Sequence, residues 1–123
     1  VWWASRDGGA RHHLGADAIT IPGDRITPML DGSIRRLFLA YDGTNLRGIV
    51  IRGRGKWEGI ETVQMYVSPL VEKDQLVSVG QTIGVAQDVA AYYKSLGKDE
   101  MTNHCHVEVW RAVNPADAVD HGH

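Results

Sequence analysis

The sequence predicts a mainly β protein: a compact antiparallel β-sheet assembly or sandwich with one short helix. Its 14 glycines are spread along 123 residues, mostly between short β-branched runs, which is the pattern of short strands joined by tight turns. The length fits a single domain, 1–123, whose residues 113–123 are expected to form a C-terminal cap. With 43% hydrophobic and 23% charged residues, such a chain can bury a core without disulfides.

Eight segments have the composition of strands. They are residues 18–21, 26–30, 33–40, 48–53, 61–68, 75–79, 82–85 and 105–110. Between the second and the third, Asp31-Gly32 predicts a hairpin, because both residues tolerate a positive φ.

One short helix is expected just before the last strand. Asp88 is a good N-cap, the following Val89-Ala90-Ala91 begins a turn, and Gly97 provides a C-cap. With this one helix among the eight expected strands, the predicted fold is mainly antiparallel β.

The charge balance and the single cysteine narrow the functional classes. Lys and Arg number 13 against 15 Asp and Glu, a net charge of −2, so no basic field indicates nucleic-acid binding. No stretch approaches the roughly 20 apolar residues of a membrane span. Cys105 cannot form an internal disulfide, and we expect it to be buried and inert.

The histidines carry the strongest chemical signal, because all six stand in three close pairs. In the first cluster, Arg-His-His-Leu-Gly-Ala-Asp at 11–17, His13 and Asp17 are four apart with Gly15 between them. The glycine and the β-branched residues that follow favour a loop entering a strand. Such a loop would let the imidazole and the carboxylate converge on one point.

The second cluster, at 103–110, alternates like a strand. Period two places His104, His106, Glu108 and Trp110 on one face and the apolar set, with Cys105, on the core face. Two imidazoles at this spacing stand roughly 6 to 7 Å apart. Both could ligate one metal, or one could ligate while the other acts on a metal-bound water.

Together the two clusters predict a metal site. His13, Asp17 and one histidine of the His-x-His strand would give three protein ligands with an open water position, the pattern of catalytic zinc. The alternative is that these are ordinary surface histidines beside an aspartate. The remaining histidines, His12, His121 and His123, are expected to be solvated.

Four motifs in order resemble the lysostaphin-type (LytM-like) zinc metallopeptidases, which cut peptide cross-links in bacterial cell walls. They are Arg-x-His-x-Gly-x-Asp at 11–17, a Pro-Gly turn and strand at 21–26, a Val-x-x-Gly-Gln-x-x-Gly segment at 77–84 and His-x-His-x-Glu at 104–108. The resemblance covers nearly the whole chain from Gly8 to Trp110.

This resemblance implies a fold, a cofactor and roles for individual residues. The fold would be a compact antiparallel β assembly of the lysostaphin (duplicated hybrid motif-like) type with a groove over one sheet. The zinc ligands would be His13, Asp17 and His106, with His104 as a catalytic histidine. Periodicity alone suggests that Glu108 orients a ligand. The partner would be a peptidoglycan peptide, and the location extracellular or periplasmic.

One position departs from that family. Where it has a second catalytic histidine, in a Tyr-x-His segment, this chain has Ser68, and a serine is neither an effective base nor a cation near pH 7. Residues 48–55 and 65–69 also resemble leukocyte cell-derived chemotaxin 2-like proteins, zinc-binding signalling proteins, although this chain lacks their several cysteines.

Two functions therefore stay open. One is a zinc metallo-endopeptidase whose activity Ser68 weakens. The other is a catalytically degenerate zinc-binding module that binds peptidoglycan or a protein partner. Tyr66 and either Tyr92 or Tyr93 are candidates for oxyanion stabilisation, against a simple packing role at a groove rim.

Overall fold

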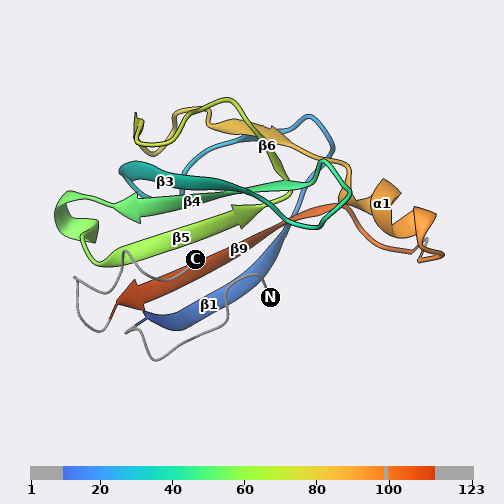
Figure 1. Cartoon of the computed structure of the whole chain (residues 1–123), viewed down its shortest axis with the longest axis horizontal. Coiled ribbons are helices and arrows are strands. Elements are labelled where there is room, and N and C mark those ends of the chain that lie inside the picture. Colours follow the sequence, from blue (N-terminus) through green and yellow to red (C-terminus); the bar gives the residue numbers. More distant parts are fainter. Residues whose placement is uncertain (1–9, 99, 113–123) are drawn as a thin grey trace.

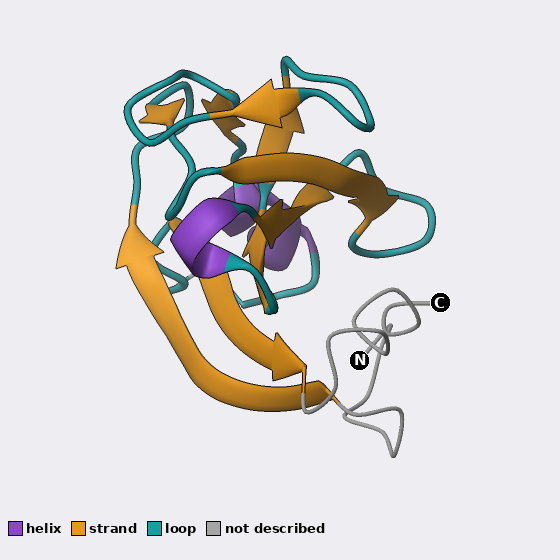
Figure 2. Cartoon of the chain, turned by 90° about the vertical axis from the view of Figure 1, so that its left-hand side faces the viewer, coloured by secondary structure: helices purple, strands orange, loops and turns teal. Residues whose placement is uncertain are grey.

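The computed structural model describes the backbone of residues 10–98 and 100–112 and the side chains of residues 15–98 and 100–111. The strands are β1 (Ala10–Ile19), β2 (Arg25–Ile26), β3 (Gly32–Leu39), β4 (Arg47–Gly53), β5 (Ile60–Met65), β6 (Val67–Pro69), β7 (Leu76–Val77), β8 (Gly84–Ala86) and β9 (His104–Ala112). The helical elements of this part are a single 3-10 turn, η1 (Gly55–Trp57), and one α-helix, α1 (Val89–Ser95). Figure 2, with strands in orange and helices in purple, shows how little of the described chain is helical.

The strands form two antiparallel sheets, one of six strands in the order β1-β9-β5-β4-β3-β7 and one of three in the order β2-β8-β6. Figure 1 shows β3, β4, β5, β9 and β1 side by side, with α1 beyond one end of the large sheet. The fold is therefore mainly antiparallel β, as the glycine and β-branched pattern predicted.

The main hydrophobic core contains residues from both sheets. Ile34, Ile49 and Ile51 of the large sheet are fully buried with Val67 and Ile83 of the small-sheet segments. Cys105 belongs to the same cluster and is 3% exposed, which confirms the prediction that it is buried.

A second buried cluster includes α1 and loop residues near it. Val50, Val63 and Trp110 of the large sheet are buried there with Val89 of the helix. The face of β9 that carries the histidines is thus partly apolar, because Trp110 joins this cluster instead of lining an open polar surface. Both faces of the large sheet take part in hydrophobic packing.

The helix and several strands agree with the sequence prediction. The carboxylate of Asp88 accepts a hydrogen bond from the amide of Ala91 at 2.9 Å and so caps α1, as expected. Gly97 follows the helix with φ of +83°, a conformation that suits glycine at a C-terminus. The strands predicted at 33–40, 48–53 and 105–110 correspond to β3, β4 and β9.

The hairpin predicted at Asp31-Gly32 is wrong. The strands before and after it, β2 and β3, lie in different sheets. The carboxylate of Asp31 accepts instead from the amide of Val79 at 2.8 Å, and its carbonyl accepts from the amide of Arg54. Long-range hydrogen bonds therefore replace the local turn.

Two other boundaries differ. The segment expected as a loop at 11–17 is strand throughout, because β1 pairs along its length with β9 and absorbs an irregularity as a bulge between His12 and Leu14. The strand predicted at 61–68 is broken at Tyr66, whose φ of +71° separates β5 of the large sheet from β6 of the small one.

Within the described part of the chain, none of the helices has the length and apolar character that crossing a membrane requires.

Candidate metal centre

Pairing of β1 with β9 brings the two predicted clusters together. Asp17 of β1 stands directly opposite His106 of β9, and Ile19 opposite His104. In chain order these segments are almost ninety residues apart, so it is the antiparallel register that builds the site.

His106 lies between two carboxylates. Its Nδ1 donates to Oδ1 of Asp17 at 2.8 Å and its Nε2 donates to Oε2 of Glu108 at 2.8 Å. Burial is the largest single influence on the pKa of His106 and lowers it. The hydrogen bonds and charges of Asp17 and Glu108 together outweigh burial, so the pKa of His106 lies above its usual value.

Glu108 is itself held in place. Its other oxygen, Oε1, accepts from the indole N–H of Trp110 at 2.9 Å. The side chain of Glu108 is only 13% exposed, and that of Asp17 is 59% exposed. The chain of contacts from Trp110 through Glu108 therefore fixes the orientation of the His106 ring from the protein side and leaves Asp17 on the solvent side.

His104 lies next to this pair in a different setting. Its Nδ1 donates to the carbonyl of Thr102 at 2.9 Å, because a carbonyl oxygen can only accept. Nε2 of the neutral ring then carries the lone pair, and it lies 4.0 Å from Oδ1 of Asp17. Among the described side chains, none forms a hydrogen bond to this nitrogen, which lies beside the Asp17–His106 pair.

A group of tyrosines packs behind His104. The rings of Tyr66 and His104 meet edge to face, with centroids 5.3 Å apart. The hydroxyl of Tyr66 lies 2.7 Å from that of Tyr41, which in turn lies 2.9 Å from the hydroxyl of Tyr93. Burial, followed by the hydrogen bond to Tyr41, raises the pKa of Tyr66 well above its usual range, so this phenol stays neutral.

These contacts favour packing over oxyanion binding for Tyr66, because its hydroxyl is directed to Tyr41. Tyr92 stacks on Tyr41 with centroids 5.4 Å apart. Sequence reasoning did not single out Tyr41, the centre of the group. No local signal marks it, because its partners lie 25 and 52 residues away along the chain.

The structure gives less information on two of the predicted site residues, His13 and Ser68. The backbone of His13 runs through the β1 bulge, but its side chain lies outside the described residues. Ser68 lies half-buried in β6, opposite Val85 of the small sheet. Of the segment 65–69, it is Tyr66 whose side chain reaches His104.

The two predicted ligands whose side chains are described, Asp17 and His106, are of the types that zinc binds. Asp17 and His106 present a carboxylate oxygen and an imidazole nitrogen side by side, and Glu108 on the far nitrogen of His106 is the outer partner that zinc-binding histidines commonly have. Within the described side chains no group of three potential ligands is complete, and the third predicted ligand, His13, falls outside them.

Comparisons with known proteins identify no related family or protein. A scan against protein-family models finds no match, and a search of curated proteins finds no similar sequence.

Proposed function

We propose that this chain is a zinc-dependent metallo-endopeptidase-like domain that acts on peptidoglycan cross-link peptides outside the cytoplasm. The observation that carries the proposal is the arrangement of Asp17, His106 and His104. A carboxylate and an imidazole adjoin each other, and a second imidazole presents a free nitrogen to the same point. The resemblance of four ordered motifs to lysostaphin-type enzymes supports the choice of substrate.

His13, Asp17 and His106 would hold the metal. When bound, zinc supplies a Lewis acid that activates water and polarises a scissile carbonyl. Glu108 keeps the ring of His106 in one orientation, so that Nδ1 faces Asp17.

His104 would carry the proton transfers. With Nδ1 committed to the carbonyl of Thr102, its Nε2 can take a proton from the attacking water and later deliver it to the leaving amine. The ring of Tyr66 against His104 limits its rotation.

Ser68 favours a second candidate, a non-catalytic zinc-binding module that binds peptidoglycan or a protein partner. General acid–base catalysis contributes about 10²–10⁴-fold, so the loss of one of two imidazoles can abolish useful turnover without affecting metal binding. Both candidates require the zinc site, and they differ only in turnover.

The decisive experiment measures zinc content together with cleavage of purified peptidoglycan and of a pentaglycine peptide. We expect one zinc per chain. His106→Ala should abolish zinc binding, because two remaining protein ligands rarely hold zinc against water. His104→Ala should keep most of the zinc affinity and lose turnover.

Cys105→Ala serves as the matched control, because Cys105 lies between the two histidines but points into the core. It should retain both zinc and turnover. Absence of zinc after incubation with the metal would overturn both candidates. Stoichiometric zinc without cleavage of either substrate would favour the second candidate, the non-catalytic zinc-binding module.

A further inference from the structure

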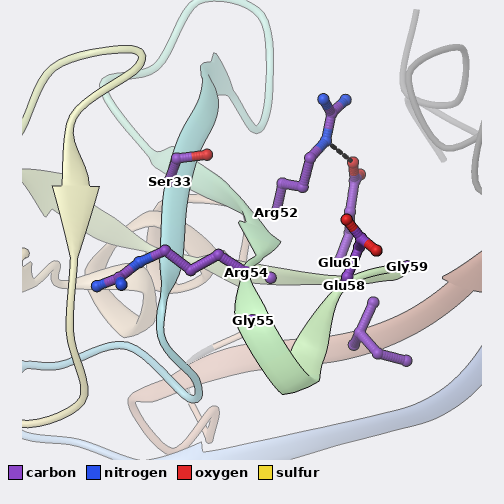
Figure 3. Close-up of a pocket in the computed structure, with 9 residues that line it drawn as sticks. Ser33, Arg52, Arg54, Gly55, Glu58, Gly59 and Glu61 are labelled. Carbon is purple, nitrogen blue, oxygen red and sulfur yellow. Dashed lines mark hydrogen bonds and ion pairs between the residues drawn. The ribbon is translucent and has the colours of Figure 1, made fainter.

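A pocket of about 350 Å³ lies at the opposite end of the large sheet from the start of β9. Its walls come from the end of β4, the η1 turn, the start of β5 and one residue of β3, drawn in Figure 3. Glu61 in this wall stands opposite Trp110, four residues along β9 from His106, which corresponds to about 13 Å of strand. The pocket is therefore separate from the candidate metal centre.

A buried carboxylate orients the cation of this pocket. Glu61 is 1% exposed, and its Oε2 lies 3.2 Å from Nε of Arg52 and 3.3 Å from Nε of Arg35. Arg52 and Arg35 therefore both contact this one buried carboxylate. The Arg52 side chain is 37% exposed, and among the described residues no contact engages its two terminal nitrogens.

An anion and a hydroxyl lie on the other walls. Glu58 is exposed, and within the described chain its carboxylate forms no ion pair, with Arg52 or with any other cation. Ser33 adds a hydroxyl group from β3. The pocket thus presents the cation of Arg52 and the carboxylate of Glu58, and among the described residues these two do not form an ion pair with each other.

The other arginine of the pocket does not compete for a ligand. Arg54 runs away from Arg52 and Glu61 (Figure 3) and donates to the carbonyls of Gly32 and Val77 at 3.3 and 3.2 Å. It also donates to the hydroxyl of Ser78 at 3.1 Å. Arg54 therefore fixes the wall and leaves Arg52 as the cation available to a ligand.

We propose that this pocket binds a small zwitterion, an amino acid or dipeptide with a free carboxylate and a free ammonium group. The terminal nitrogens of Arg52 match a carboxylate in bidentate geometry, and Glu58 accepts from the ammonium group. A volume of about 350 Å³ is in the range of small-molecule pockets.

The charges disfavour simpler ligands. A purely anionic group such as phosphate would be repelled by Glu58, and a purely cationic one by Arg52. This inference goes beyond the proposed peptidase function and needs no metal.

The test is an amide NMR titration of metal-free protein in a chelator, with alanyl-alanine as the probe. We expect saturable shifts at residues 52–61 with a dissociation constant of about 1 mM. N-acetyl-alanyl-alanine lacks the ammonium group and alanyl-alanine amide lacks the carboxylate, so each should bind about tenfold or more weakly. The chelator removes zinc, which a dipeptide would otherwise coordinate.

Variants assign the two charges separately. Glu58→Gln should weaken dipeptide binding about tenfold and should leave binding of the amine-blocked probe unchanged. Arg52→Lys keeps a cation beside Glu61 but loses bidentate geometry, so it should weaken both carboxylate-bearing probes. Glu72→Gln, at another exposed glutamate, is the matched control and should bind as wild type.

The proposal is overturned if the dipeptide gives no saturable shifts at millimolar concentration, if both capped probes bind as tightly as alanyl-alanine, or if the shifts map to 104–108. Failure of the peptidase proposal would leave these results unaffected, because zinc is absent throughout.

Discussion

At the scale of single residues, Glu108 does more than fill its position on β9. One of its carboxylate oxygens accepts from His106 and the other from Trp110, each within 2.9 Å. His106 and Trp110 both donate to this side chain, so each needs its own acceptor oxygen. The two oxygens of the glutamate carboxylate supply them. The side chain thereby connects the buried cluster around Trp110 to the proposed metal ligand His106.

Glu108→Gln should weaken zinc binding about 10–100-fold, the usual cost of losing an outer partner of a metal-bound histidine. The amide offers one acceptor and one donor, so it satisfies either His106 or Trp110 but places an N–H against the other. Zinc affinity measured by competition with a chelating dye tests this. The exposed Glu72→Gln is the control, and equal affinity of the two variants would refute the role of Glu108.

Cys105 should be unreactive. It is 3% exposed, and burial, followed by the charge of Asp17, raises the pKa of its thiol to about 11. At pH 8 about one thiol in a thousand is then ionised, and the thiolate is the reactive form. Labelling by a thiol reagent should be far slower than in the unfolded protein and should accelerate as pH rises toward 11. Rapid labelling of the folded protein at pH 8 would contradict the burial.

At the scale of elements, the junction of β5 and β6 is where the chain passes from one sheet to the other. Tyr66 makes the turn with φ of +71°, a conformation that is costly for a non-glycine residue. Its amide donates to the carbonyl of Arg47 at 2.6 Å and its carbonyl accepts from the amide of Gln87 at 2.9 Å. These bonds and the buried ring hold the strained backbone in place.

Tyr66→Phe should lower the free energy of unfolding by about 1 kcal/mol, because it removes one partly buried hydrogen bond and keeps the ring against His104. Tyr41→Phe removes two such bonds and should cost about twice as much. Urea unfolding of both variants gives the comparison. If Tyr66→Phe matched wild type, the hydroxyl chain would contribute nothing to stability.

The sequence could predict elements whose signals are local. Short β-branched runs between glycines located β3 and β4, alternation located β9, and Asp88 and Gly97 bounded the helix. It also placed His106 and Glu108 on one face, as their hydrogen bond confirms. The predicted hairpin at Asp31 was wrong because that residue bonds to Val79, 48 residues away, and no short window of sequence carries that information.

The same limit applies to the site. The clusters at 11–17 and 103–110 were predicted to supply one metal site, and Asp17 and His106 lie side by side. The loop that Gly15 suggested, which was to bring His13 and Asp17 together, is wrong, because pairing of Gly15 with Glu108 across the sheet makes it part of β1. The break at Tyr66 and the tyrosine group behind His104 depend on contacts between distant segments, so composition and spacing did not reveal them.

At the scale of the whole molecule, the large sheet takes part in two separate hydrophobic clusters. One contains residues of the small sheet and the other contains Val89 of α1 together with Trp110. Strand β9 contributes to both, through Cys105 and Trp110. The strand that carries the proposed ligand His106 is therefore packed on both faces, and this arrangement favours a rigid site over a mobile one.

Ser68 tests the proposed activity, because it stands in the small sheet at the position where the lysostaphin-type family that the sequence resembles has a second catalytic histidine. Its neighbour Val67 is fully buried and Tyr66 contacts His104, so the segment itself is firmly placed. Ser68→His would add a group that is partly cationic near neutral pH and can stabilise a developing oxyanion. We expect turnover of a pentaglycine peptide to rise about 10–100-fold, less than the full ~10²–10⁴ range because the surrounding residues did not evolve to support an imidazole.

The control is Ser95→His, which places the same side chain on an exposed position of α1, and zinc content is measured for all three proteins. Ser95→His should bind one zinc and cleave no faster than wild type. Vigorous cleavage by wild type would mean that another residue already supplies the missing function. A zinc-loaded Ser68→His protein without any gain, but with undiminished binding to peptidoglycan, would favour the non-catalytic module, since a restored imidazole would then have no reaction to accelerate.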